Sequence, residues 1–269
     1  MYKLIALDMD GTLLGHDKQI SARNKAAIAA ARQQGVTVVL ASGRPLEGMT
    51  RYLDELAMTG ADDYVICYNG TLVQRAADRS VIRSQALRGL DASRVAQLAR
   101  QLGVNVHAFS RTLGLITPAL NHYTEHESRL NDLPITLLDF AELDPEDEIL
   151  KVMLIDPPEL LTPAIAQLPT SLYEDYTVVQ SAPFFLEIMN RHSHKGAGVS
   201  ALAEHLGIER RQVICMGDAG NDSHMIEYAG LGIAMGNATD ELKALAGHIT
   251  ASNDEDGVAV AIERFVLGA

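Results

Sequence analysis

The sequence predicts an α/β fold, a doubly wound Rossmann-like parallel sheet whose chain is interrupted by an inserted α+β cap domain. Near both ends of the chain, runs of consecutive apolar residues alternate with helical patterns, as in parallel strands covered on both faces. In the middle, strand patterns outnumber helix patterns. The chain has 269 residues, 47% of them hydrophobic, which is enough for one large core or two moderate ones.

The N-terminal part alternates strand and helix patterns as a βαβαβ unit does. The predicted strands are residues 4–7, 36–42 and 64–70, and the predicted helices are residues 21–35 and 45–58. The same rhythm returns near the C-terminus, over residues 196–207, 212–218, 221–230, 230–235, 239–247, 248–252 and 257–267. Together these two parts predict a single doubly wound sheet.

The middle of the chain differs in its pattern. Strand patterns lie at residues 104–110, 113–118, 135–139, 149–156, 176–182 and 184–190, with helix patterns at residues 91–103 and 157–168. Prolines mark turns between several of these segments. The sequence therefore predicts a core made of residues 1–83 and 192–269, with residues 84–191 as the inserted domain.

Composition and charge argue against several classes of partner. Asp plus Glu total 35 against 22 Lys plus Arg, and a net charge of -13 repels nucleic acid and anionic lipid. No stretch approaches the roughly 20 apolar residues of a membrane span, and Asp8 interrupts the first apolar run too early for a signal peptide. Cys67 and Cys215 lie in apolar runs, as reduced core thiols do. We expect a soluble, cytoplasmic protein with no nucleic-acid or membrane partner.

Polar residues follow three of the predicted strands, at the sheet edge where ligands of doubly wound folds bind. They are Asp8 and Asp10, then Ser42, Gly43 and Arg44, then Gly217 and Asp218, with Asn221 and Asp222 soon after. Parallel strands bring their carboxyl ends to one edge of the sheet. These residues are therefore expected to lie near one another.

The pair Asp8 and Asp10 favours a metal site. Side chains at positions i and i+2 leave a strand on the same side, so both carboxylates can approach one centre. Their repulsion would raise one pKa strongly unless a cation lies between them. With Asp218 they make a three-carboxylate oxygen site that suits Mg²⁺. The alternative is that the two aspartates only cap the following turn or helix.

A phosphate ligand would give these residues a mechanism. One carboxylate can attack phosphorus in line, while the other protonates the departing alkoxide and later activates water. Ser42 can supply a hydroxyl and Gly43 an unobstructed N–H, and both would stabilise charge on the phosphoryl oxygens. Lys195 precedes an amphipathic helix and could supply a cation there. Taken alone, such a lysine is more often a surface residue.

The order of these segments resembles the haloacid dehalogenase (HAD) phosphatase superfamily. It runs DMDGT at residues 8–12, SGR at 42–44, a lysine starting a helix at 195, and GDAGND at 217–222. Further stretches are similar to the Cof-type branch: YNG, LKVMLID, APFFLEI, AGLGIAMGNA and SNDEDGVA. That branch carries a large α/β cap, of C2 type, between its second and third motifs. The resemblance implies the same arrangement here.

The resemblance also implies roles for the acidic residues. Asp8 would be the nucleophile and a Mg²⁺ ligand. Asp10 would be the general acid and base, and a metal ligand through its backbone carbonyl. Asp218 would complete the metal site, and Asp222 would act through a metal-bound water.

A second set of residues would hold the phosphoryl group. By the same resemblance, Met9 would contribute its backbone N–H, so that its side chain is free to pack. Ser42 and Gly43 would hold the transferring group and Lys195 would neutralise it. Asn221 would bind phosphate or orient Lys195.

Two features lie outside what the resemblance explains. His192, His194 and His224 flank the matched residues where less basic ones are expected, and they are either ordinary surface residues or a source of pH sensitivity. Substrate choice should depend on polar residues at strand ends or beside cap strands. The candidates are Arg44, Asn69, His107, Arg111, Tyr123 and Gln180.

The leading hypothesis is a Mg²⁺-dependent phosphatase for small phosphorylated metabolites such as hexose or pentose phosphates. A phosphomutase is an alternative, although nothing in the sequence favours a long-lived phosphoenzyme. A signalling receiver module also combines acidic residues, Mg²⁺ and phospho-aspartate on a doubly wound sheet, but it needs neither this length nor an inserted cap. A non-catalytic sugar-phosphate sensor is a further alternative, and a homodimer is compatible with the sequence.

Overall fold

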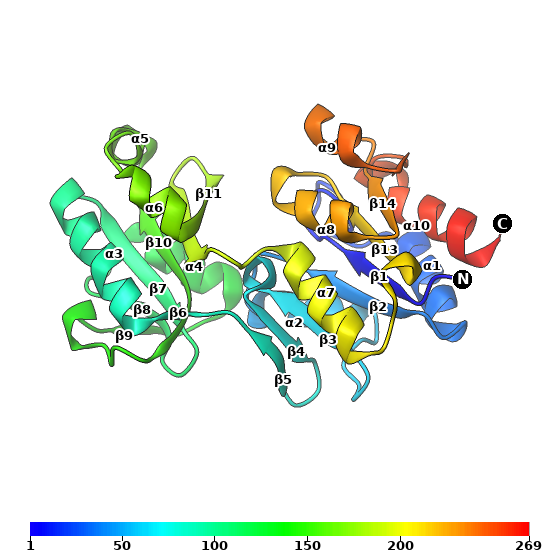
Figure 1. Ribbon diagram of the computed structural model, residues 1–269, viewed down its shortest axis with the longest axis horizontal. Coiled ribbons are helices and arrows are strands. Elements are labelled where there is room, and N and C mark those ends of the chain that lie inside the picture. The colour runs from blue at the N-terminus through cyan, green and yellow to red at the C-terminus, as the bar shows by residue number, and fades with distance from the viewer. Residues whose placement is uncertain (269) are drawn as a thin grey trace. The chain divides into compact units, whose positions relative to one another are not determined.

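The computed structural model describes residues 1–268 (Figure 1). The chain divides into two compact units. The first unit combines Met1–Ser84 with the residues from His194 onward, and the second is Gln85–Ser193. No helix within the described residues is long and apolar enough to cross a membrane.

The first unit is built on one sheet, with its strands in the order β15-β14-β13-β1-β2-β3-β4-β5. Neighbours from β15 to β3 are parallel, whereas β4 and β5 are antiparallel. The strands are β1 (Leu4–Leu7), β2 (Thr37–Ala41), β3 (Tyr64–Cys67), β4 (Leu72–Arg75), β5 (Val81–Ser84), β13 (Val213–Gly217), β14 (Leu231–Ala234) and β15 (His248–Ile249). The predicted α/β class with a parallel core is confirmed. The β4–β5 hairpin is an addition that the sequence did not predict.

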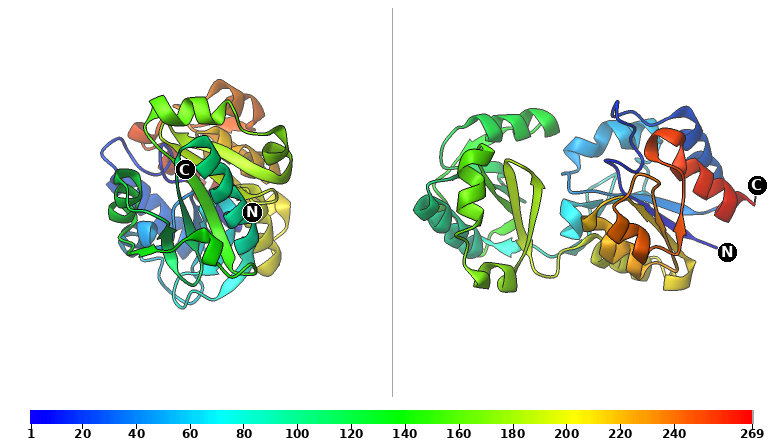
Figure 2. Two further views of the ribbon diagram at one scale, coloured as in Figure 1. Left: turned by 90° about the vertical axis from the view of Figure 1, so that its left-hand side faces the viewer. Right: turned by 90° about the horizontal axis from the view of Figure 1, so that it is seen from above.

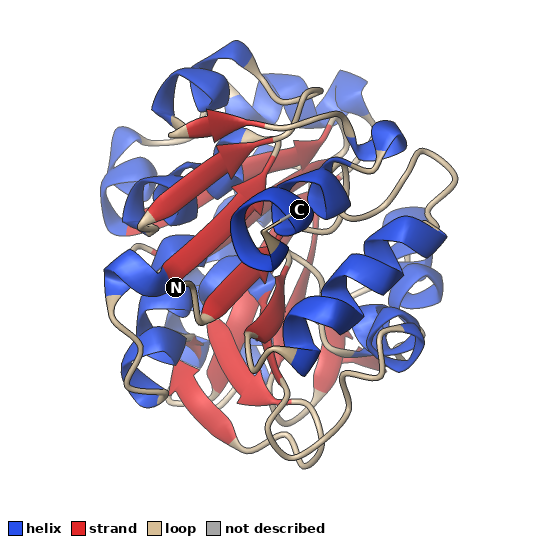
Figure 3. Cartoon of the chain, turned by 90° about the vertical axis from the view of Figure 1, so that its right-hand side faces the viewer, coloured by secondary structure: helices blue, strands red, loops and turns tan. Residues whose placement is uncertain are grey.

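Helices cover both faces of this sheet (Figure 3). Helix α1 packs against α10, and α7 packs against α8. The helices are α1 (Ala22–Gln33), α2 (Thr50–Glu55), α7 (Lys195–His205), α8 (Ser223–Tyr228), α9 (Asp240–Leu245) and α10 (Gly257–Ile262). Because both faces are covered, strands β1, β3 and β13 are buried at every position. This explains their continuous apolar runs.

The second unit is a mixed sheet in the order β11-β12-β10-β7-β8-β9, with β6 pairing with β10. Its strands are β6 (Leu87–Arg88), β7 (Asn105–Ser110), β8 (Gly114–Thr117), β9 (Ile135–Leu137), β10 (Glu148–Ile155), β11 (Tyr176–Ala182) and β12 (Phe185–Asn190). Its helices are α3 (Gly89–Leu102), α4 (His122–Asn131), α5 (Pro158–Ile165) and α6 (Thr170–Asp175). Among these strands only β8 and β9 form a parallel pair.

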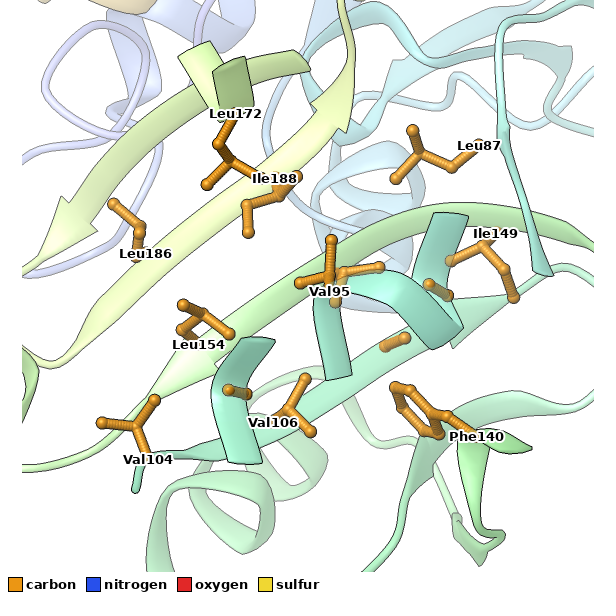
Figure 4. Close-up of a cluster of buried hydrophobic side chains, with 14 of the residues drawn as sticks. Leu87, Val95, Val104, Val106, Phe140, Ile149, Leu154, Leu172, Leu186 and Ile188 are labelled. Atoms are coloured by element: carbon orange, nitrogen blue, oxygen red, sulfur yellow. The ribbon is translucent and has the colours of Figure 1, made fainter. Parts of the chain in front are cut away.

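The two faces of the second sheet differ in character. Val106 and Leu154 belong to an apolar core that also includes Val95 of α3 (Figure 4). Residues alternate along a strand, so the chain neighbours of Val106 in β7 and of Leu154 in β10 point to the other face of the sheet. There His107 contacts Thr124 of α4. Helices α3 and α4 therefore lie on opposite faces of this sheet (Figure 2).

Candidate active site

Three neighbouring parallel strands of the first unit end in the predicted polar residues. Asp8 follows β1 and Ser42 follows β2. Asp218 follows β13, which pairs with β1 on its other side. Lys195 is the first residue of α7. Asp8, Lys195 and the residues after β13 meet at one site, as their hydrogen bonds show.

Lys195 links two carboxylates in the interior. Its side chain is 0% exposed, and its Nζ donates to Asp8 Oδ1 at 2.5 Å and to Asp222 Oδ1 at 2.6 Å. The second oxygen of Asp222 accepts the N–H groups of Asp218 and Ala219, at 3.0 and 3.1 Å. A Cβ at Gly217 would lie 2.5 Å from Asp222 Cβ, so glycine is required for this close approach. A buried ammonium held by two carboxylates has a fixed position.

Negative charge exceeds positive charge in this cluster. Burial raises the pKa of Asp8 well above its ordinary value, Asp222 and Asp218 raise it further, and Lys195 only partly opposes them. Burial also raises the pKa of Asp218. Burial alone would lower the pKa of Lys195, but Asp222 and Asp8 outweigh it and the pKa is raised. The cluster thus contains one ammonium and three carboxylates, and this balance of charge favours the binding of a further cation.

The acidic donors fit a hard metal ion. Asp8, Asp218 and Asp222 each offer a carboxylate oxygen, and these oxygens lie within 4.8 Å of one another. Thr12 Oγ1 donates to Asp218 Oδ1 at 2.9 Å. A Cβ at Gly11 would lie 2.4 Å from Asp218 Oδ2, which keeps the loop after β1 close to Asp218. An all-oxygen set of this kind suits Mg²⁺.

The side chain of Asp10 contacts Arg44 and Lys18, and it is not among the three carboxylates of the cluster. We expected both carboxylates of the pair on one side of a strand, but β1 ends at Leu7 and the chain then turns. Arg44 instead holds the Asp10 carboxylate with two hydrogen bonds, of 2.9 and 2.8 Å, and Lys18 donates at 2.9 Å. Burial raises the pKa of Asp10, but these cations outweigh it and the pKa is lowered. The third carboxylate of the cluster is Asp222. A role for the Asp10 backbone carbonyl stays a prediction.

We expect Arg44→Met to lower kcat roughly 10- to 100-fold, because an unclamped Asp10 loses the position needed for proton transfer. Ratios of kcat/KM between substrates should stay unchanged, since the guanidinium acts on Asp10. Steady-state kinetics on two phosphate esters measures both quantities. Arg79→Met is the control, because Arg79 pairs with Glu47 at the surface. A variant with intact kcat but altered substrate ratios would support the specificity role first predicted for Arg44.

Three of the predicted phosphate-binding residues, Ser42, Gly43 and Asn221, lie beside Asn69. Ser42 is buried, and its Oγ accepts the N–H of Arg44 at 3.2 Å. A Cβ at Gly43 would lie 3.2 Å from the Asn69 side chain. Asn221 Nδ2 donates to Asn69 Oδ1 at 3.2 Å. Met9 is fully buried, which agrees with a packing role for its side chain.

Two asparagines that the sequence analysis missed brace the loop after Asp10. Asn237 Nδ2 donates to the Gly11 carbonyl at 2.8 Å, and Asn253 Nδ2 donates to the Leu14 carbonyl at 2.9 Å. The N–H of Asn253 also donates to Asn237 Oδ1 at 2.9 Å. Asn237 and Asn253 each come a few residues after a strand, β14 and β15. The rule that polar residues after strands form the site could therefore have found them.

Two of the three unexplained histidines, His194 and His224, contact each other, and His194 also caps a helix. His194 Nδ1 accepts the N–H of Ala197 at 3.1 Å, so it caps the N-terminus of α7. The rings of His194 and His224 stack at 4.1 Å between centroids. His192 is exposed. His194 is therefore a helix-capping residue.

The remaining specificity candidates lie in the second unit, and three of them adjoin residues 183–185: the rings of His107 and Tyr123 both lie near Phe185, and Gln180 donates to the Pro183 carbonyl. His107 is fully buried, and burial with the nearby charge of Lys151 lowers its pKa to about 3. Tyr123 stacks on Phe184 at 5.2 Å. Arg111 pairs with Glu148, which begins β10, whereas Phe185 pairs with Ile155, which ends that strand. Their role in substrate choice stays a prediction.

Comparisons with known proteins bear on this site. A family model described as haloacid dehalogenase-like hydrolase matches residues 5–262. YxeH of Bacillus subtilis (strain 168), provisionally described as a phosphatase, is 43% identical over 99% of each chain. The 5-amino-6-(5-phospho-D-ribitylamino)uracil phosphatase YitU of the same organism is 30% identical over 97% of each. The crystal structure of a haloacid dehalogenase-like hydrolase from Bacteroides thetaiotaomicron matches at 33% identity and a TM-score of 0.86, covering 98% of this chain and 99% of that one.

Proposed function

Since the chain belongs to the haloacid dehalogenase-like hydrolases and is a phosphatase of that superfamily, we propose that it is a Mg²⁺-dependent sugar phosphatase that works through an aspartyl phosphate on Asp8. The observation that carries this proposal is the buried contact between Lys195 and Asp8 beside two further carboxylates. A nucleophile placed beside a fixed cation is suited to an anionic phosphoryl group.

The residues divide the reaction into two steps. Asp8 attacks phosphorus in line as the bond to the leaving oxygen breaks, and Asp10 gives its proton to the departing alkoxide. Water then attacks the aspartyl phosphate, Asp10 takes the proton of that water, and the bond from phosphorus to Asp8 breaks. Lys195, Ser42 and the backbone around Gly43 stabilise the phosphoryl charge. The clamp of Arg44 on Asp10 favours its ionised form, which suits the second step and works against proton donation in the first.

The metal would be held by the carboxylates of Asp8 and Asp218, together with the backbone carbonyl of Asp10. Asp222 already accepts hydrogen bonds from the Lys195 ammonium and from two backbone N–H groups. It would therefore hold Lys195 and the Asp218 backbone in position. When bound, Mg²⁺ would neutralise charge on the phosphate oxygens. The excess of carboxylates over ammonium groups supports this assignment.

Substrate choice is assigned to the second unit, Gln85–Ser193. The named substrate of YitU carries its phosphate on a ribityl chain, and this supports a polyhydroxylated phosphate monoester as substrate here. Polar side chains discriminate strongly among such molecules, because a missing hydroxyl leaves a buried polar group without its partner. Tyr123 and Gln180 are the proposed contacts, with Arg111 as a further candidate, whereas the buried His107 is assigned no contact with substrate.

A substrate panel tests the proposal. Purified protein is incubated with hexose, pentose and polyol phosphates with Mg²⁺, or with EDTA, and released phosphate is measured. We expect release from several polyhydroxylated esters with Mg²⁺ and only background release with EDTA. Isomer formation from glucose 1-phosphate, without release, would favour a phosphomutase. Release that EDTA leaves unchanged would contradict the metal assignment.

A further inference from the structure

The turn Tyr68–Gly70, which follows β3, has an unusual backbone. Its three residues have φ angles of 51°, 54° and 89° in succession. Two of them, Tyr68 and Asn69, carry a Cβ, for which this left-handed region is costly. All three are buried. Such strain persists only where the surroundings hold it, and it concentrates at functional sites.

The turn holds the loop after β2 from one side. The N–H of Asn69 donates to the Ser42 carbonyl at 2.9 Å, and the N–H of Tyr68 donates to the Arg44 carbonyl at 3.2 Å. Gly43 lies between these two bonds, where a Cβ would come within 3.2 Å of Asn69 Nδ2. The path of the Ser42–Arg44 backbone is therefore set by the turn.

The same turn contacts two other elements of the proposed phosphate site. A Cβ on Gly70 would lie 2.3 Å from the His194 carbonyl and 3.2 Å from the Lys195 backbone nitrogen, so the turn packs directly against the start of α7. The Asn69 side chain accepts the amide N–H of Asn221 at 3.2 Å. Three elements that are distant in sequence thus meet at one strained turn.

We propose that Asn69 is a positioning residue that fixes the Asn221 amide relative to the Ser42–Gly43 backbone, so that both can reach one phosphoryl group. The inference rests on the proposed function, because it takes Ser42, Gly43 and Asn221 as phosphate-binding groups. Asn69 suits this place for two reasons. Asparagine tolerates the left-handed conformation better than most residues with a Cβ, and its Oδ1 supplies the acceptor for Asn221.

A double-mutant cycle between Asn69 and Asn221 tests this role. Asn69→Gly removes the amide but keeps the left-handed backbone accessible, so the fold should be retained. We expect Asn69→Gly and Asn221→Ala each to lower kcat/KM and the affinity for orthophosphate by roughly 10- to 100-fold. The double variant should be no more than about threefold worse than the poorer single variant, because the two residues act as a unit.

A control variant and two contrary outcomes make the test of Asn69 decisive. Ala57 also has a positive φ, of 51°, so Ala57→Gly makes the same backbone change away from the site and should leave all values unchanged. Additive losses in the cycle would overturn the proposal, as would wild-type phosphate affinity in Asn69→Gly. Suppose that the wild-type protein hydrolyses no ester but the phosphate-binding cycle remains non-additive. Then the proposed function fails and the positioning role of Asn69 stands.

Discussion

Replacing Asp8 by asparagine is expected to lower kcat by at least about 10⁴-fold, because an amide cannot form the acyl phosphate. Asparagine has nearly the same shape, so the contacts around Lys195 change little. The fold should be retained, since burial disfavours the ionised form of Asp8 and removing that charge relieves its repulsion with Asp218 and Asp222. Phosphate release over hours and a thermal melt measure the two effects.

Asp62→Asn is the matched control for Asp8→Asn. Asp62 is exposed in the loop before β3, and its replacement should leave kcat and the melting temperature unchanged. Turnover by Asp8→Asn within tenfold of the wild-type rate, with the wild-type KM, would place the nucleophile elsewhere. Residual turnover with a different KM would point to a contaminating phosphatase, and repurification would resolve that case.

The sequence was sufficient to locate the ends of the central strands. Asp8, Ser42 and Asp218 follow continuous apolar runs, and such runs form buried parallel strands whose carboxyl ends lie together. The argument from positions i and i+2 does not describe Asp10, because β1 ends at Leu7 and both aspartates follow it. In the structure the chain turns after Leu7, and Gly11 adopts a φ of 88°. Strand periodicity gives no side-chain direction for residues that follow the end of a strand.

Contacts between residues far apart in the chain could not be predicted from the sequence. Asp10 and Arg44 are 34 positions apart, and Asn69 and Asn221 are 152 apart, so no local pattern links them. His107 shows a different limit. Alternation along β7 correctly separates it from Val106, but it cannot show that α4 covers that face and buries the ring. A polar residue in a strand therefore looked more available to a substrate than it is.

Lys195→Met is expected to reduce both stability and activity. The side chain of Lys195 is 0% exposed, and its removal leaves Asp8 and Asp222 buried without their cation. Breaking a buried ion pair from one side costs about 3–5 kcal/mol of unfolding free energy, and kcat should fall about 10³-fold with the loss of charge stabilisation. Urea unfolding and phosphate release measure these effects. Lys3→Met, at an exposed position, should change neither.

The pH dependence separates this electrostatic effect from a loss of packing. Burial already raises the pKa of Asp8, and without the opposing ammonium it should rise further, so the folded variant binds a proton at Asp8 more readily than the folded wild type does. The stability of Lys195→Met should therefore recover relative to wild type as the pH falls from 7 to 5. Adding Asp222→Asn should also recover part of the loss at pH 7, because it removes one uncompensated charge. A deficit that stays constant over this pH range, and that Asp222→Asn does not reduce, would mean that Lys195 stabilises the fold by packing and leaves the carboxylates unaffected.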